Sequence, residues 1–115
     1  MTDIKTLTEK VIAFRDARDW KQFHNAKDSA LALSVEASEL LELFRFKNGQ
    51  ELEEYAKSGK AAIARELIDV LYWTLLMIND LEINVEETLD KKLEENDKKY
   101  PIEKSKGKAT KYTDL

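Results

Sequence analysis

Two pairs of carboxylates stand in parts of the sequence that are otherwise strongly apolar. Glu36 and Glu39 lie in a stretch rich in alanine and leucine, and Glu66 and Asp69 lie in residues 61–81, the most apolar stretch of the chain. Residues three apart share one face of a helix. Burying such charges without partners is costly. The four acids must therefore raise their pKa, pair with bases or bind a cation.

A hard divalent cation is one partner that suits four carboxylates. Mg²⁺ takes oxygen ligands in octahedral geometry and keeps waters for substrate phosphates, and it lowers the pKa of a bound water. Mn²⁺ favours the same ligands. Because four carboxylates exceed the charge of one divalent ion, two or more ions or nearby lysines also fit. Two alternatives need no metal: the acids pair with Arg45 or Arg65, or they lie on solvated helix faces.

Composition excludes several other chemistries. The 115 residues include no cysteine, so disulfides, thiolate zinc sites and cysteine nucleophiles are absent, and His24 is the only histidine. The net charge of −4 argues against binding to nucleic-acid polymers. The N-terminus has no apolar signal core, which indicates a cytoplasmic protein, and residues 61–81 carry too many charges for a membrane span.

The spacing of apolar residues predicts an all-α protein. With three glycines and one proline, there is room for long helices. We expect helices from Thr2 or Thr6 to about residue 18, from a cap at Asn25 or Asp28 to about 47, over 60–81, and from a cap at Asn84 to about 100. Residues 19–27 are expected as a connector and residues 50–57 as a short polar helix.

These helices are expected to form one domain over residues 1–115, a compact four-helix bundle-like protomer with a lysine-rich tail from about residue 102. The helix over 60–81 is apolar on nearly every side, and four short helices cannot cover it alone. We therefore expect the protomer to complete its core by oligomerisation, with this helix near the subunit contact.

The pattern as a whole resembles a known family, the all-α nucleotide pyrophosphohydrolases of the MazG type, and in particular their small dCTP pyrophosphatase branch. The family signature is an E-x-x-E helix followed by an E-x-x-D helix, here Glu36–Glu39 and Glu66–Asp69. The matching surroundings are residues 18–24, 30–41, 66–71 and 92–101. Together the resemblance extends from about residue 4 to 107, nearly the whole chain.

The resemblance implies Mg²⁺-dependent hydrolysis of a nucleoside triphosphate to the monophosphate and pyrophosphate. Glu36, Glu39, Glu66 and Asp69 would be metal ligands, and Glu39 would also orient or deprotonate the attacking water. The family assembles as tetramers built from two tight dimers. The family's phosphate-contacting segment is matched by Lys92, Asn96, Lys99 and Tyr100, although a solvated basic face is the alternative reading of these residues.

Aromatic residues beside the two motifs are candidates for contact with the nucleobase. Trp20, Phe23 and His24 precede the first acidic pair, and Trp73 follows Asp69 by one helical turn. Without the resemblance, Trp20 and Phe23 are more simply core anchors, and His24 is a turn histidine whose hydrogen bonds are satisfied. The dCTP-preferring branch is expected to have a tyrosine where this chain has Trp73, so the preferred base stays open.

Three rival functions remain. A non-catalytic helical interaction module predicts acids paired with Arg45 or Arg65 and no affinity for Mg²⁺. A di-iron carboxylate bundle normally needs two Glu-x-x-His elements, which His24 is not placed to supply. The third rival function is hydrolysis of another substrate by the same fold, for instance dUTP or a phosphoribosylated histidine precursor.

Overall fold

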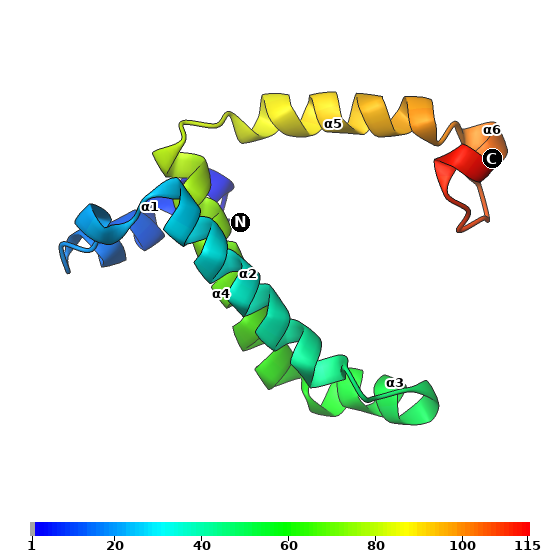
Figure 1. The fold of residues 1–115 in the computed structure, drawn as a ribbon, viewed down its shortest axis with the longest axis horizontal. Helices are drawn as coiled ribbons and strands as arrows, with labels where there is room; N and C mark the ends of the chain where they lie inside the picture. The colour runs from blue at the N-terminus through cyan, green and yellow to red at the C-terminus, as the bar shows by residue number, and fades with distance from the viewer. Residues whose placement is uncertain (1) are drawn as a thin grey trace. The chain divides into compact units, whose positions relative to one another are not determined.

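The computed structural model describes residues 2–115, which are helical with no strand among them (Figure 1). This confirms the all-α class. The chain falls into two compact units that divide after Glu82, and each is described by itself. Three of the four helices expected in the bundle lie in the first unit, and the fourth lies in the second. The first unit holds α1 (Ile4–Asp16), α2 (Ala26–Phe44), α3 (Gly49–Ser58) and α4 (Lys60–Asp80).

Side-chain caps fix where the long helices begin. The Asn25 side chain accepts a hydrogen bond from the Asp28 backbone N–H at 2.8 Å and starts α2, as expected. Asn84 caps α5 in the same way. The expected start of the first helix at Thr2 or Thr6 is wrong. Asp3 caps α1 by accepting from the Thr6 N–H at 2.8 Å, because a carboxylate is a strong acceptor at a helix N-terminus.

The acidic helices α2 and α4 lie side by side and run in opposite directions, joined at one end by α3 (Figure 1). Gly49 has a φ of 55°, a left-handed conformation that separates α2 from α3. The Phe44 and Tyr55 rings then meet edge to face, with centroids 5.8 Å apart. The expected short helix after Asn48 is thus present. This hairpin sets the register in which the two acidic pairs face each other.

The first unit has a very small apolar core. Leu75 and Leu76 are the only apolar residues buried in residues 2–115, and both belong to α4. Large apolar side chains elsewhere in this unit are exposed, among them Leu31 and Leu41 on α2 and Ile68 on α4. Within the same described range, no helix is long and apolar enough to cross a membrane.

The second unit contains α5 (Val85–Lys99), the short α6 (Ile102–Ser105) and a final 3₁₀ turn, Tyr112–Asp114. The lysine-rich segment after Pro101 is therefore folded locally. Its Tyr112 ring meets the Tyr100 ring edge to face at 5.9 Å, and the Lys99 ammonium lies 5.1 Å from the Tyr112 ring centroid.

Candidate metal centre and adjoining aromatic cavity

The hairpin of α2 and α4 brings the four predicted carboxylates together. Glu36 and Glu39 come from α2, and Glu66 and Asp69 come from α4. One oxygen from each residue lies within 4.8 Å of the corresponding oxygens of the other three. Each pair occupies one helix face because its members are three residues apart. Sequence spacing alone predicted the acidic face of each helix. The antiparallel packing of α2 and α4 turns these two faces toward each other.

Two of these carboxylates have an oxygen that is buried and unpaired. Oε2 of Glu36 and Oε2 of Glu66 are shielded from solvent and have no hydrogen-bond partner among the described residues. Glu39 and Asp69 are exposed. Buried polar atoms in folded proteins almost always have a partner. One unpaired oxygen from each helix, inside the same cluster, indicates a ligand that the protein itself does not supply.

The electrostatics of the cluster agree with this geometry. Burial raises the pKa of Glu36, and the neighbouring Glu39 carboxyl raises it further. Burial likewise raises the pKa of Glu66, with additional repulsion from Glu39 and Asp69 that outweighs the opposite effect of Arg65. In both cases the charged form is disfavoured until a positive charge arrives.

A divalent metal ion fits this donor set. All four ligands offer oxygen, the donor preferred by Mg²⁺ and Mn²⁺. Oxygens bound to one Mg²⁺ lie about 2.1 Å from it and so at most about 4.2 Å from each other. A small contraction of the cluster would bring its oxygens into that range. Two ions sharing the four carboxylates would need less movement.

The ion pairs of this structure do not support the hypothesis that the four acids pair with Arg45 or Arg65. Arg45 pairs with Glu42 at 3.0 Å, on the exposed surface of α2. Across residues 2–115, no ion pair includes any of the four clustered acids. The pairing that a non-catalytic interaction module predicts is therefore absent from the described part of the chain.

An aromatic cavity of about 550 Å³ adjoins the acids. Asp69 belongs to both, because it is a member of the acidic cluster and also part of the cavity wall. Most of the remaining wall is aromatic or aliphatic, which is typical of a site for a flat organic group. The complete lining consists of Lys10, Val11, Phe14, Trp20, His24, Asp69, Tyr72 and Trp73.

Three of the four residues predicted to contact a nucleobase line this cavity. Trp20 and His24 form one part of the wall, and the His24 and Trp73 rings meet edge to face at 5.1 Å. The Nδ1 atom of His24 is buried and has no partner among the described residues. Phe23 does not line the cavity, and 66% of its surface is exposed. Whether any of them contacts a base stays a prediction.

The cavity wall that α1 contributes was not predicted from the sequence. It consists of Lys10, Val11 and Phe14. The edge-to-face contact of Phe14 with Tyr72, at 6.3 Å, joins α1 to α4 at this place. Nothing in the spacing of α1 distinguishes a cavity wall from ordinary core. The position of Tyr72 three residues after Asp69 was the one signal that could have identified it.

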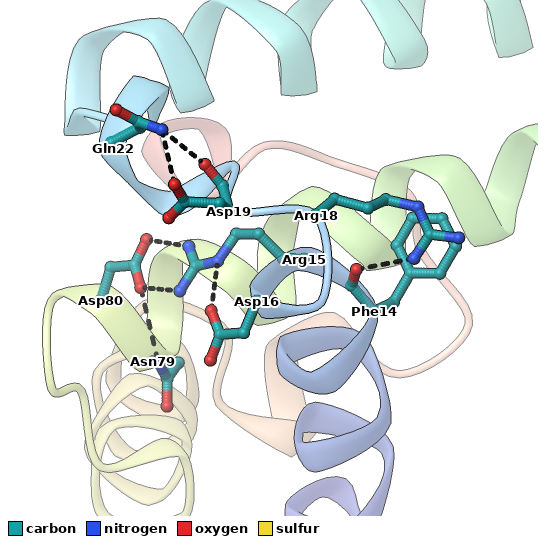
Figure 2. Close-up of polar contacts among 8 residues, drawn as sticks. All are labelled: Phe14, Arg15, Asp16, Arg18, Asp19, Gln22, Asn79 and Asp80. Atoms are coloured by element: carbon teal, nitrogen blue, oxygen red, sulfur yellow. Dashed lines mark hydrogen bonds and ion pairs between the residues drawn. The ribbon is translucent and has the colours of Figure 1, made fainter.

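A buried ion pair closes the packing of α1 on α4 (Figure 2). The Arg15 guanidinium donates to both carboxylate oxygens of Asp80, at 2.7 and 2.9 Å. The Arg15 side chain is 1% exposed, and that of Asp80 is 21% exposed. Hydrogen bonding from Arg15 lowers the pKa of Asp80. The four acids have no ion pair among residues 2–115, whereas this carboxylate has a positive partner there.

The predicted phosphate-contacting residues lie in the second unit. Lys92, Asn96 and Lys99 follow one another at helical spacing on α5, so they share one face of it. The Lys92 Nζ atom also lies 3.6 Å from the Glu95 Oε2 atom. The backbone N–H of Tyr100 donates to the Asn96 carbonyl at 2.8 Å. Their role toward a substrate stays a prediction.

Comparison with known proteins gives matches to one family. The MazG-like family matches residues 31–115, which include both acidic pairs. The dCTP pyrophosphatase 1 of Mus musculus is 36% identical over 104 residues, and the protein of the same name in Homo sapiens is 32% identical over 104 residues. Each match covers 89% of this chain and 61% of the relative. The chain thus spans about six tenths of the length of the curated relatives it matches.

A solved structure is similar over nearly its whole length. The crystal structure of a pyrophosphatase from Archaeoglobus fulgidus matches with a TM-score of 0.81 and 33% sequence identity. The match covers 88% of this chain and 94% of the archaeal one.

Proposed function

The chain belongs to the MazG-like family, and on that premise we propose that it is a metal-dependent nucleoside triphosphate pyrophosphohydrolase. It would convert a nucleoside triphosphate and water into the monophosphate and pyrophosphate. The observation that carries this proposal is the cluster of four carboxylates with two buried, unpaired oxygens, at Glu36 and Glu66. Relatives named as pyrophosphatases support the same reaction class.

In this proposal Glu36, Glu39, Glu66 and Asp69 hold Mg²⁺, with Mn²⁺ as a substitute. A bound divalent ion would neutralise phosphate charge and lower the pKa of a coordinated water. Glu39 is exposed and can reach solvent, so we assign it the role of orienting the attacking water and accepting its proton. The bond that breaks joins the α- and β-phosphates, and pyrophosphate leaves.

The aromatic cavity is the proposed place of the nucleobase. Trp20, His24 and Trp73 offer ring faces and edges for stacking, and Asp69 connects this wall to the metal ligands. A deoxynucleotide such as dCTP is the proposed substrate, because relatives with up to 36% identity are named dCTP pyrophosphatases. Removal of unwanted nucleotides from the pool is the corresponding biological role.

For the phosphates, the resemblance to the family assigns Lys92, Asn96, Lys99 and Tyr100. Their helical spacing on α5 supports a shared role. We expect Lys92→Ala and Asn96→Ala to raise the KM for dCTP. Helical content measured by circular dichroism should stay unchanged, which separates this outcome from unfolding.

We also propose a homotetramer built as a dimer of dimers. The small core of the first unit and the exposed Leu31, Leu41 and Ile68 support an apolar contact with further copies. Light scattering after gel filtration would measure the mass of the assembly. A monomer across the working concentration range would contradict this part of the proposal.

The central test is a panel of purified nucleotides. The protein is incubated with each dNTP and NTP in the presence of Mg²⁺, and monophosphate and pyrophosphate are measured separately. We expect both products in equal amounts, with dCTP among the best substrates, and no products when a chelator is present. If no nucleotide yields pyrophosphate, the enzymatic proposal fails.

A further inference from the structure

We propose that the Arg15–Asp80 ion pair is a positioning pair for the aromatic cavity, which fixes α1 against α4 and thereby sets the affinity for the substrate. The inference rests on the proposed function, since it treats this cavity as part of the substrate site. Neither residue lines the cavity or belongs to the acidic cluster. Both would therefore act through other side chains.

The geometry of the pair is directional. Two guanidinium nitrogens of Arg15 meet the two oxygens of Asp80 in a parallel fork, which constrains both distance and angle (Figure 2). Arg15 lies in the last turn of α1, and Asp80 is the last residue of α4. An acid is unfavourable at the C-terminal end of a helix, so Asp80 depends on Arg15 for its charge balance.

Several parts of the cavity wall are attached to Arg15. Lys10, Val11 and Phe14 precede it within about one and a half turns of α1. After the helix, the Arg15 carbonyl accepts a hydrogen bond from the Trp20 N–H at 3.3 Å. A shift of Arg15 would therefore move the α1 wall and the tryptophan together.

The turn between Arg15 and Trp20 is held in an unusual conformation. Asp19 has a φ of 54°, in the left-handed region that non-glycine residues seldom adopt. Its carboxylate and its carbonyl both accept from the Gln22 amide, at 2.9 and 3.0 Å (Figure 2). Such a conformation persists only where the surroundings fix it. The fork at Arg15 attaches the start of this turn to α4, beside the aromatic contact of Phe14 with Tyr72.

A role in stability alone would not require this pair. Buried ion pairs often contribute no more to stability than apolar residues of similar size. What the charged fork adds is orientation, and the wall it orients lines the same cavity as Trp73 and Asp69 of α4. Asp80 is 11 residues beyond Asp69, about 16 Å along the helix, so it is too far away to take part in the chemistry itself.

The test uses the whole chain and four variants. Arg15→Met removes the positive partner, and the double variant Arg15→Met with Asp80→Leu replaces both charges by apolar groups, which keeps a folded protein available if the single variant unfolds. Arg15→Lys keeps the charge but not the fork. Arg45→Met is the matched control, because Arg45 makes an exposed ion pair on α2.

Two independent readouts are available. Steady-state kinetics with dCTP and Mg²⁺ separates KM from kcat. Tryptophan fluorescence with acrylamide quenching reports on the cavity without any catalysis, because the two tryptophans of the chain, Trp20 and Trp73, both line it.

For the folded double variant we expect a KM for dCTP raised roughly tenfold with kcat nearly unchanged. The concentration of Mg²⁺ needed for half-maximal activity should stay the same, and acrylamide quenching should increase. Arg15→Lys should lie between wild type and the double variant in KM and quenching, and Arg45→Met should behave as wild type. A double variant with the KM and quenching of wild type overturns the inference, as does a loss of kcat with unchanged KM.

Failure of the proposed function would look different. If the wild-type protein hydrolyses no nucleotide, the enzymatic proposal falls, and the quenching series still decides whether the pair fixes the cavity. Quenching that is unchanged in the double variant overturns the positioning role by itself.

Discussion

The first unit contains two groups of partly buried charge that are balanced in opposite ways. At the end of α4, Asp80 has a bidentate partner in Arg15, and both oxygens are satisfied. Earlier in the same helix, Glu66 and the acids around it have no ion pair within the described residues, and the Glu66 Oε2 atom has no hydrogen-bond partner there. Similar carboxylates on one helix are thus paired in one place and left unpaired in the other.

The pKa shifts express the same contrast. Hydrogen bonding from Arg15 lowers the pKa of Asp80, whereas burial raises the pKa of Glu66. A carboxylate with a lowered pKa stabilises the fold in its charged form, and one with a raised pKa opposes folding when charged. A carboxylate of the first kind therefore belongs to the architecture. The second kind costs stability, which a functional ligand can offset.

The largest effect is expected from neutralising the acids that have no partner. Glu39→Gln and Asp69→Asn should each lower turnover of dCTP by at least about a hundredfold, because each removes a ligand charge and Glu39 also acts on the water. Pyrophosphate release measures this loss. Calorimetric titration with Mg²⁺ should show weakened binding in both variants.

A matched acid outside the cluster serves as the control for that prediction. Glu42→Gln changes an exposed glutamate of the same helix, whose partner is Arg45. It should keep its turnover and its Mg²⁺ affinity. If Glu39→Gln and Asp69→Asn retain full activity while folded, the contrast between paired and unpaired carboxylates has no functional meaning.

Breaking the balanced pair should instead unfold the protein more easily. Arg15→Met leaves the Asp80 carboxylate partly buried without its partner, and the expected loss of stability is roughly 3 kcal/mol, the lower end for buried pairs because Asp80 is 21% exposed. Urea unfolding followed by circular dichroism measures it. Asp80→Leu added to Arg15→Met should recover most of this loss. A further loss of stability in the double variant would show that the two apolar side chains do not pack.

The response to pH should have opposite signs at the two places. The pKa values of Glu36 and Glu66 are raised above the usual 4.5. Near and above pH 4.5 the folded protein therefore binds more protons than the unfolded one. In a chelator, stability should therefore fall as pH rises from about 4.5 toward neutrality. Asp80 has a lowered pKa, so its contribution is lost only as pH falls below its usual value of 3.8.

Thermal unfolding between pH 4.5 and 7 measures this dependence. Mg²⁺ should reverse the decline at neutral pH, because binding to the folded state stabilises it. Glu36→Gln should flatten the profile recorded in chelator. A melting temperature that rises over this pH range in chelator would contradict the raised pKa values.

The sequence predicted the unpaired group far better than the paired one. Spacing within Glu36–Glu39 and Glu66–Asp69 placed each pair on a helix face, and apolar surroundings made the charges conspicuous. The caps at Asn25 and Asn84 were also predictable, because capping is a local interaction between residues three positions apart. Local patterns of this kind are present in the sequence itself.

Other features depend on contacts between distant segments. Arg15 and Asp80 are 65 residues apart, and each resembles an ordinary surface charge on an amphipathic helix. The cavity wall from Lys10 to Phe14 was missed for the same reason, since helical periodicity shows which face is buried but not what that face meets. The first helix is capped by Asp3 and not by Thr2 or Thr6. All three residue types can cap a helix, and only the geometry decides between them.

The smallest effect is expected from a charge pair on the exposed surface. This pair is the baseline for the acidic cluster and for the Arg15–Asp80 pair. Arg45 and Glu42 meet at 3.0 Å on the surface, with side chains 56% and 58% exposed. Exposed pairs of this kind contribute about 0.2–0.5 kcal/mol because water and salt screen them. Arg45→Met should therefore change the free energy of unfolding by no more than that, with turnover unchanged. A loss in urea unfolding as large as that of Arg15→Met would mean that burial is not what separates the two pairs.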